Sequence, residues 1–237
     1  TVVNLAGYID HSKKRKVFDS HYIGVKKIAN FFSQNKTNKF IQIGSSVEYG
    51  FVKSPVKENS KINKRSLKSI YGLSKFLATD YMQKIYAKNN QKYLIIRPFL
   101  IYGPYQNINR LIPFVINQCK LGKSFPCSSG EQVRDFLYID DFINLLIESI
   151  KKQKIKNGIY NAGSGKPITV KTVIKLIKSE VKKGYPLYGK LKMRKDEPSI
   201  LYANIKKTKK EFKWQPKISI KKGIKETVKF FLKNEIR

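Results

Sequence analysis

Short apolar runs alternate with helical segments along the first half of the chain, and this alternation restricts the fold more than any other feature. The apolar runs lie at 2–6, 40–43 and 93–96, and each is followed closely by glycine, serine or proline. Between them, over about 16–34 and 70–88, apolar residues recur at the three- and four-residue intervals of a helix face. Strands that alternate with helices through short turns form a parallel sheet covered on both faces. We therefore predict a doubly wound α/β fold.

The alternation becomes less regular after Pro104. We expect a further strand at 159–162 and helices near 111–119, 140–151, after Thr169 and at 220–232. This portion is interpreted as a smaller α/β lobe that is interleaved with the end of the sheet. The chain shows no internal repeat.

The composition restricts the class of protein. With 41% hydrophobic residues the chain can bury a core, so general disorder is excluded. The longest apolar stretch, Phe142 to Ile150, is interrupted by Asn144 and Glu148, well short of the ~18 residues that span a bilayer. The two cysteines, Cys119 and Cys127, suggest neither a disulfide framework nor a metal site. We expect a soluble, cytoplasmic protein that binds no metal and no membrane.

The charge raises the question of a polyanionic partner. The formal net charge is +33, but only seven of the 49 basic residues are arginine, the residue favoured where bases and phosphates are held by paired hydrogen bonds. The lysines are spread over the whole chain. We expect most of them to be solvated surface charges and expect no nucleic-acid partner, while binding of RNA or another polyanion stays open as the alternative.

Tyr71 and Lys75 form the most informative local pattern. They lie four residues apart in an expected helix and so share one face. A nearby ammonium favours the phenolate and lowers the pKa of a tyrosine, which could then exchange a proton with a substrate hydroxyl or carbonyl. The spacing alone is weak, since the same Tyr/Lys pattern occurs at Tyr22/Lys26, Tyr49/Lys53, Tyr188/Lys192 and Tyr202/Lys206.

The surroundings distinguish Tyr71 from the other tyrosines. The strand at 40–43 leads into Ser45-Ser46-Val47-Glu48-Tyr49-Gly50. In a parallel α/β sheet, the carboxyl end of a strand and the start of the next helix lie at one rim, where ligands bind. A hydroxyl from Ser45 could therefore orient the same oxygen atom that Tyr71 protonates.

Together these segments resemble the extended short-chain dehydrogenase/reductase family, and more narrowly its NAD-dependent nucleotide-sugar epimerases, dehydratases and 4-ketoreductases. Six motifs carry the resemblance in the family's order: NLAG at 4–7, SSVEYG at 45–50, YGLSK at 71–75, RPFLIYGP at 97–104, RDFLYIDD at 134–141 and YNAGSG at 160–165. The resemblance extends into the tail, at Arg194 to Pro198 and at Trp214 to Pro216. It implies a Rossmann-like sheet and a role in polysaccharide biosynthesis.

The resemblance also implies roles for individual residues. Ser45, Tyr71 and Lys75 match the catalytic triad, with Tyr71 as acid/base and Lys75 as its partner and a ligand of the nicotinamide ribose. Further cofactor contacts fall on Ala6, Gly7 and Pro98. Substrate contacts fall on Ser46 and, at the nucleotide diphosphate, on two arginines whose guanidinium forks suit phosphate, Arg134 and Arg194.

Departures from the family pattern are informative too. The glycine-rich turn that holds the dinucleotide phosphates is absent, and the chain begins at what resembles the fourth strand of the family. About 60 residues, two βα units, would precede it. We interpret the sequence as a fragment, expect the 237 residues alone to bind dinucleotide poorly and to be inactive, and leave the choice between NAD and NADP open.

Other departures narrow the reaction. Dehydratases of this group carry Asp-Glu where this chain has Ser46 and Val47, and 3,5-epimerases carry a cysteine at the position of Val47. The resemblance therefore implies 4-epimerisation or 4-keto reduction. His21 and Leu100 stand where many members have asparagine, and His21 could be a surface residue or a site residue.

The resemblance completes the domain and partner predictions. Residues 1–104 are assigned to the C-terminal part of a Rossmann domain, whose sheet is completed by part of 133–165. Residues 105–132 and 166–237 are assigned to a substrate-binding lobe. We expect a nucleotide-diphosphate sugar as substrate and a homodimer. In the alternative, a non-catalytic short-chain-dehydrogenase-like protein binds RNA or another polyanion through its basic surface.

Overall fold

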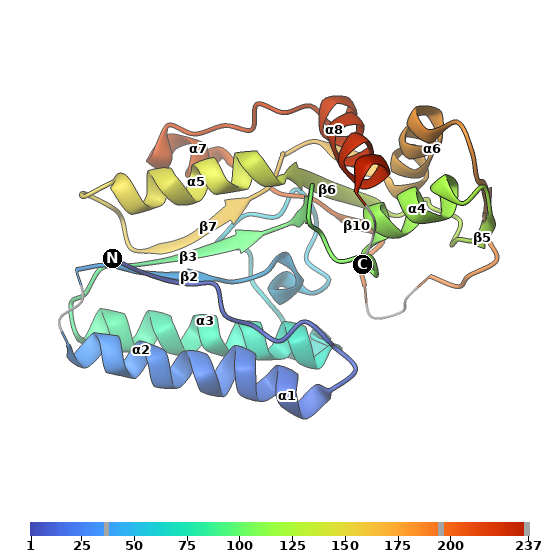
Figure 1. Ribbon diagram of the computed structural model, residues 1–237. Helices are drawn as coiled ribbons and strands as arrows, with labels where there is room; N and C mark the ends of the chain where they lie inside the picture. The colour runs from blue at the N-terminus through green and yellow to red at the C-terminus, as the bar shows by residue number, and fades with distance from the viewer. Residues whose placement is uncertain (36–37, 194–196, 235–237) are drawn as a thin grey trace.

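A four-stranded parallel sheet forms the centre of the larger half of the molecule (Figure 1). The computed structural model describes residues 1–35, 38–193 and 197–234. The strands are β1 (Val2–Asn4), β2 (Phe40–Ile43), β3 (Tyr93–Pro98) and β7 (Gly158–Ala162), in the spatial order β1-β2-β3-β7. The expected strands at 40–43, 93–96 and 159–162 are confirmed, and the first strand ends two residues earlier than expected.

Helices cover both faces of this sheet, as Figure 1 shows. One face carries α2 (Val25–Gln34) and α3 (Ile70–Lys88), preceded by α1 (Lys14–Phe18) and a π-helical segment over Asp19–Gly24. The other face carries α5 (Ile139–Lys151) and α7 (Lys206–Phe212). The helix expected over about 16–34 is therefore present, with a π-helical segment inside it that the periodicity does not reveal.

The alternation of side chains along the strands explains the two layers. Phe40 and Ile95 pack in a buried cluster with residues of α2 and α3. Their neighbours along the strands, Ile41, Leu94 and Ile96, belong to a second buried cluster with residues of α5 and α7. Successive residues of a strand point to opposite faces, so strands apolar on both faces must be covered twice.

The lobe is built around a second, smaller sheet. In it β6 (Val133–Tyr138) lies between β10 (Ile200–Leu201) and β4 (Leu100–Tyr102), parallel to both, and also pairs antiparallel with β8 (Pro167–Thr169). A short pair, β5 (Ser124–Pro126) with β9 (Tyr185–Leu187), lies at its far end. None of these short strands was predicted from the sequence, because each depends on pairing with a distant segment.

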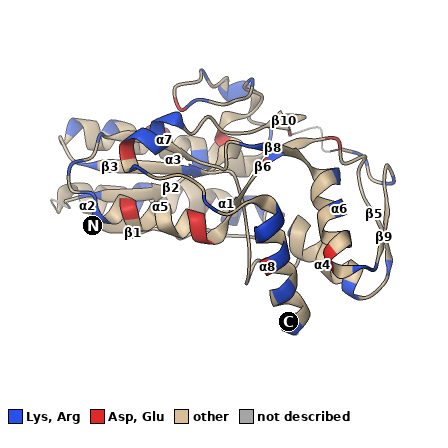
Figure 2. Cartoon of the chain, turned by 90° about the horizontal axis from the view of Figure 1, so that it is seen from above, with Lys and Arg blue, Asp and Glu red and all other residues tan. Residues whose placement is uncertain are grey.

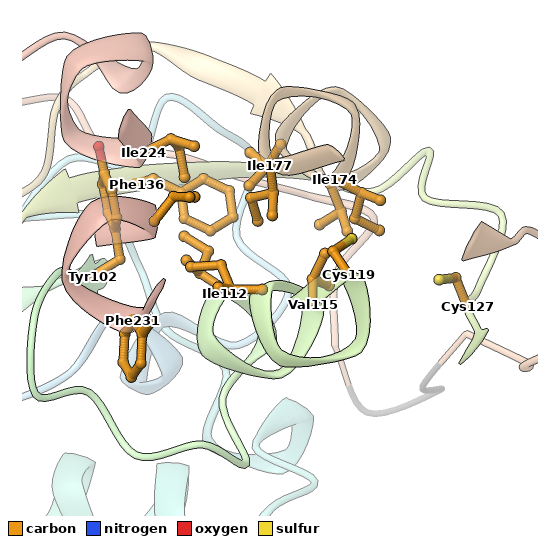
Figure 3. Packing of buried hydrophobic residues seen from close by; sticks show 14 of the residues in the cluster. Tyr102, Ile112, Val115, Cys119, Cys127, Phe136, Ile174, Ile177, Ile224 and Phe231 are labelled. Atoms are coloured by element: carbon orange, nitrogen blue, oxygen red, sulfur yellow. The ribbon is translucent and has the colours of Figure 1, made fainter. Parts of the chain in front are cut away.

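Three helices complete the lobe: α4 (Leu111–Lys120), α6 (Val170–Val181) and α8 (Ile220–Lys233). Figure 3 shows their shared core, in which Ile112 and Val115 of α4 face Ile174 and Ile177 of α6. Cys119 and Cys127 both belong to this core, and both are free. The helices expected after Pro104, which are α4, α6 and α8 of the lobe and α5 on the main sheet, are confirmed to within a residue or two.

Basic side chains are distributed over both halves of the molecule (Figure 2). They occupy the outer surfaces of α6, α7 and α8 as well as the loops around the main sheet. Among the residues that the structure describes, no helix is long and apolar enough to cross a membrane.

Candidate functional site

A pocket of about 740 Å³ opens between the carboxyl ends of the main sheet and the lobe. Its walls come from the loop after β2, the start of α3, the segment after β3, the start of α4, and β6, and they include Ser45, Tyr71, Pro98, Arg110 and Arg134. The sequence-predicted site residues Ser45, Ser46, Tyr71, Pro98 and Arg134 therefore share one cavity.

Ser45 begins a short 3₁₀ helix over Ser46–Tyr49, directly after β2. Its hydroxyl accepts a hydrogen bond from the backbone N–H of Val47 at 3.4 Å, and its own backbone N–H donates to Glu48 Oε1 at 2.7 Å. This reciprocal capping box fixes both the backbone and the side chain of Ser45 at the pocket wall. Ser46 is 5% exposed and lines the same wall.

Tyr71 stands in the first turn of α3, whose N-cap is Ser69. The Ser69 hydroxyl accepts from the N–H of Gly72 at 3.0 Å, which anchors the helix start. The Tyr71 ring is stacked on His11, with ring centroids 4.2 Å apart, and meets the edge of His21 at 4.9 Å. The direction is opposite to the one expected from Lys75: burial raises the pKa of Tyr71 above its usual value, and a side-chain hydrogen bond with Ser45 and the charge of Arg110 oppose this without reversing it.

Lys75 lies one helical turn after Tyr71 and is 5% exposed. Its Nζ donates to the carbonyl oxygen of Ile43, the last residue of β2, at 2.8 Å, and lies 6.0 Å from the centroid of the Tyr71 ring. Burial lowers the pKa of Lys75 to about 8, and the carboxylate of Glu48 acts in the opposite direction. At neutral pH the amine is therefore mainly protonated, and one hydrogen bond ties it to the sheet rim.

His21 is a buried residue beside Tyr71, which decides between the two positions that the sequence leaves open. It is 4% exposed and lies in the π-helical segment. Its Nε2 is 3.0 Å from the carbonyl oxygen of Tyr8, and its ring packs so closely on Gly7 that a Cβ there would lie 2.5 Å from Cε1. Burial lowers the pKa of His21 to about 4, so the ring is neutral at physiological pH.

The predicted cofactor contacts fall in two places. Pro98 lines the pocket. Ala6 and Gly7 are exposed at the carboxyl end of β1 and are not among the pocket's lining residues. Beside them Leu5 and Ile9 are 66% and 69% exposed, which leaves an apolar surface next to the two small residues.

Arg134 stands on β6 at the lobe end of the pocket. Its Nη2 donates to Glu197 Oε2 at 3.0 Å, and its Nη1 donates to the carbonyl oxygens of Val133 at 2.9 Å and Ser199 at 3.2 Å. The guanidinium is thus held by the protein itself, while it still lines the cavity. Arg194, the second predicted arginine, lies outside the described residues.

Sequence reasoning missed three residues around the triad. His11 stacks on Tyr71, Arg110 lines the pocket and lowers the pKa of Tyr71 through its charge, and Glu48 holds the Ser45 loop. His11 lies in an irregular loop, so no periodicity predicts its position. Arg110 gives a weak signal as the residue before an expected helix. Glu48 gives the clearest signal, because an acid lies within an otherwise apolar and small-residue motif.

The chain belongs to the family described as "NAD dependent epimerase/dehydratase family", whose model matches residues 1–163. It is 31% identical over 185 residues to a putative UDP-glucose 4-epimerase of Methanocaldococcus jannaschii, covering 76% of this chain and 58% of that protein. It is 32% identical over 150 residues to the CDP-abequose synthase of Salmonella muenchen, covering 61% and 50%. The chain thus spans about half the length of the curated relatives that it matches.

Solved structures confirm the predicted fold. The UDP-glucuronic acid 4-epimerase of Bacillus cereus, in complex with UDP-glucuronic acid and NAD, superposes with a TM-score of 0.89 at 22% identity, over 97% of this chain and 74% of that one. The dTDP-glucose 4,6-dehydratase of Bacillus anthracis, in complex with NAD, gives a TM-score of 0.85 at 24% identity, over 98% and 72%. The expected Rossmann-like class is therefore correct, and the family model shows that the expected family is correct as well.

The cofactor of the family is NAD, which agrees with the nicotinamide dinucleotide that the sequence predicts. The residues described here fit its nicotinamide end. Lys75 uses one N–H on Ile43 and has two more to donate. The small residues Ala6 and Gly7 leave the end of β1 open beside an apolar surface.

Proposed function

We propose that this chain carries the catalytic part of an NAD-dependent nucleotide-sugar 4-epimerase or 4-ketoreductase. The observation that carries the proposal is the presence of Ser45 and Tyr71 in one pocket, with the amine of Lys75 6.0 Å from the centroid of the Tyr71 ring. Bound NAD would accept a hydride from C4 of the sugar, and bound NADH would supply one to a C4 carbonyl carbon. The residues of this chain would move the proton and hold the substrate.

Tyr71 is the proposed proton donor and acceptor at the C4 oxygen. Burial holds its pKa above the usual value, so the phenol is protonated at neutral pH and suited to donate to a C4 carbonyl oxygen as that carbonyl is reduced. In the reverse direction the phenolate form of Tyr71 accepts the proton of a C4 hydroxyl. The ammonium of Lys75, 6.0 Å from the ring centroid, then stabilises the phenolate that forms.

Ser45 is the proposed second ligand of the C4 oxygen. Ser45 and Tyr71 line the same pocket, a side-chain interaction with Ser45 is one of the factors that lower the pKa of Tyr71, and the capping box prevents the Ser45 loop from turning away. An oxygen held by both groups would have its lone pair directed at the proton of Tyr71, which is the geometry that proton transfer needs.

The far end of the pocket is proposed to hold the nucleotide diphosphate. Lys14, Lys68, Arg110 and Arg134 line the cavity, and this excess of cations favours an anionic ligand. Arg134 would exchange or share its contact with Glu197 when phosphate oxygens arrive, because a guanidinium has five donors. Arg194 stays a prediction as the second diphosphate ligand.

Two residues favour reaction at C4 over dehydration. Ser46 lines the pocket beside Ser45, and Val47 follows it. Neither side chain can act as the acid and base that removal of water from the sugar requires. The family as a whole includes dehydratases, so this narrower assignment depends on these two positions.

Three further predictions from the sequence belong to this proposal. We propose the division into a Rossmann part, 1–104 with part of 133–165, and a substrate-binding lobe, 105–132 with 166–237. We also propose that the protein forms a homodimer and acts in the cytoplasm. Size-exclusion chromatography with light scattering tests the dimer, and a single monomer mass at micromolar concentration would contradict it.

The test of the proposed function is turnover of nucleotide sugars by the full-length protein and its Tyr71→Phe variant. UDP-, dTDP- and CDP-sugars, with and without a 4-keto group, are incubated with NAD or NADH, and products are identified by NMR. Tyr71→Phe keeps the ring stacked on His11 and removes the proton donor, so kcat should fall at least about 10³-fold while NAD affinity changes little. Tyr22→Phe, at another Tyr/Lys pair, is the matched control and should keep wild-type turnover.

The products separate the two reactions. An epimerase interconverts the C4 epimers without net consumption of cofactor, whereas a ketoreductase consumes one NADH for each 4-keto sugar. Turnover that persists in Tyr71→Phe would end the assignment of Tyr71.

A further inference from the structure

Glu48 has no exposed surface and is not among the residues that line the pocket. We propose that it is a positioning residue: its carboxylate fastens the Ser45 loop to the helix that carries Tyr71 and Lys75, and its charge tunes both of these groups. The kinetic part of this inference rests on the proposed function. The structural and electrostatic parts do not.

The carboxylate of Glu48 joins three elements of the fold. Oε1 accepts from the backbone N–H of Ser45 at 2.7 Å. Oε2 accepts from the Thr79 hydroxyl of α3 at 2.7 Å, and from Nε and Nη2 of Arg97 on β3 at 2.9 and 2.7 Å. Each oxygen therefore has a partner, as a buried carboxylate requires.

The contact on α3 lies on the same helix face as the proposed catalytic groups. Tyr71, Lys75 and Thr79 follow one another at four-residue intervals, which places them in one row along the helix. A hydrogen bond to Thr79 therefore fixes the rotation of this row, and the second oxygen of the same carboxylate fixes Ser45. One side chain thereby sets how Ser45 and Tyr71 stand relative to each other.

The backbone leaves room for this carboxylate only because residue 44 is glycine. A Cβ at Gly44 would lie 2.5 Å from Glu48 Oε1 and 3.1 Å from Arg97 Cγ. Such a contact with Oε1 is closer than real Cβ atoms adopt, so any other residue at position 44 would displace the ion pair. The loop Gly44-Ser45 and the pair Glu48–Arg97 are thus one interlocking unit.

The charge of Glu48 reaches both proposed catalytic groups. It raises the pKa of Lys75 and the pKa of Tyr71. The Tyr71 phenol also faces His11 and His21 through ring contacts, and Lys75 and Arg110 are its cationic neighbours. Glu48 is the only anion among the groups named here, and its side chain has no exposed surface. Removal of its charge should therefore lower the pKa of both groups.

The test is a titration of Tyr71 that needs no turnover. The full-length protein is labelled with [¹³Cζ]tyrosine, the Tyr71 resonance is assigned by its loss in Tyr71→Phe, and its midpoint is followed by NMR in wild type and in Glu48→Gln. Glutamine keeps the acceptor for the Ser45 N–H and removes the charge. We expect the Tyr71 midpoint to fall by about 0.5–1 pH unit.

Asp141→Asn is the matched control. Asp141 is 2% exposed and accepts the backbone N–H groups of Lys217 and Ile218, both at 2.9 Å, so it is another buried acid that holds a loop. The Asp141→Asn substitution should lower the free energy of unfolding without changing the pH midpoint of the Tyr71 titration. An unchanged midpoint in Glu48→Gln, or an equal change in Asp141→Asn, would overturn the electrostatic part of the proposal.

If Glu48→Gln does not fold, the double variant Glu48→Gln/Arg97→Gln is titrated in its place. It removes both members of the ion pair and leaves neither charge buried alone, and the Tyr71 midpoint should again fall.

Kinetics test the positioning part. Thr79→Val removes one hydrogen bond and keeps the charge, so kcat should fall about tenfold while the KM for NAD and the Tyr71 midpoint stay unchanged. An unchanged kcat would refute positioning through α3. A wild-type protein that turns over no nucleotide sugar would refute the proposed function instead, and the titration would still decide the role of the Glu48 charge.

Discussion

The two ends of the pocket are built in different ways. At the sheet end, Ser45 and Tyr71 are placed by elements close to them in the sequence, a 3₁₀ turn and the first turn of α3. At the lobe end, Arg134 is held by Glu197 and Ser199, more than 60 residues away along the chain. The sheet end is thus defined by local geometry and the lobe end by tertiary packing.

Two buried acids show the same contrast. Glu48 reaches back to Ser45, three residues away. Asp135, at the lobe end, accepts the backbone N–H groups of Ser164, Gly165 and Ala203 at 2.6, 3.0 and 3.1 Å. The comparison indicates that substitutions at the sheet end should change the chemistry, whereas those at the lobe end should change stability and substrate binding.

The largest expected effect is at the sheet end. Lys75→Met removes the ammonium that we propose stabilises the Tyr71 phenolate, so kcat in the full-length protein should fall about 10³-fold. The matched control is Lys53→Met, which removes the lysine of another Tyr/Lys pair and should keep wild-type kcat. Steady-state assays of both variants check this. An equal loss of kcat in Lys75→Met and Lys53→Met would contradict the special role of the sheet end.

At the lobe end, Asp135→Asn should act on stability. An amide has one acceptor oxygen where the carboxylate has two, so at least one of the buried N–H groups loses its partner, and the free energy of unfolding should fall by about 3 kcal/mol. Urea unfolding followed by circular dichroism measures this. Asp140→Asn, at an exposed neighbouring acid, should change the value by less than about 0.5 kcal/mol.

At the sheet end, His21 packs against Tyr71 and should make the free energy of unfolding depend on pH. Its pKa of about 4 in the folded protein lies below the 6.5 of an exposed histidine. The stability that this difference provides is present above pH 6.5 and is lost as the pH falls toward 4, by about 2–3 kcal/mol.

His21→Asn should flatten this part of the stability curve, measured by thermal unfolding between pH 4 and 7.5. The chain has only two histidines, so His11→Asn is the natural control. A wild-type slope in His21→Asn would show that other groups cause the acid sensitivity.

The smallest expected effect is on substrate binding. Arg134→Met should raise the KM for the nucleotide sugar about 10- to 100-fold and leave kcat nearly unchanged, because the proposed diphosphate contact would be made equally in the ground and transition states. Arg65→Met, which removes an exposed arginine outside the pocket lining, serves as the control. A fall in kcat with unchanged KM would place Arg134 in the chemistry rather than in binding.

The same contrast explains what the sequence can predict. Ser45, Tyr71 and Lys75 follow recognisable strand and helix patterns, so their common position at the sheet rim could be anticipated. The ion pair of Arg134 with Glu197 could not be predicted from the sequence, because Glu197 lies beside Arg134 only when β10 pairs with β6. The stacking of His11 on Tyr71 likewise depends on how an irregular loop folds back over α3.

The π-helical stretch over Asp19–Gly24 has a consequence for mutation. In such a stretch each backbone hydrogen bond spans one residue more than in an α-helix, so one residue is accommodated as an insertion. Deleting one residue of this stretch other than His21 would let the ordinary spacing return and would leave the segment before it in nearly the same orientation, because the extra residue is the one removed. A one-residue deletion within α2, Val25–Gln34, is not absorbed in this way and would turn everything before it by about 100° about the helix axis. Val17 would then leave the interior, and the imidazole of His21 would move away from the phenol of Tyr71.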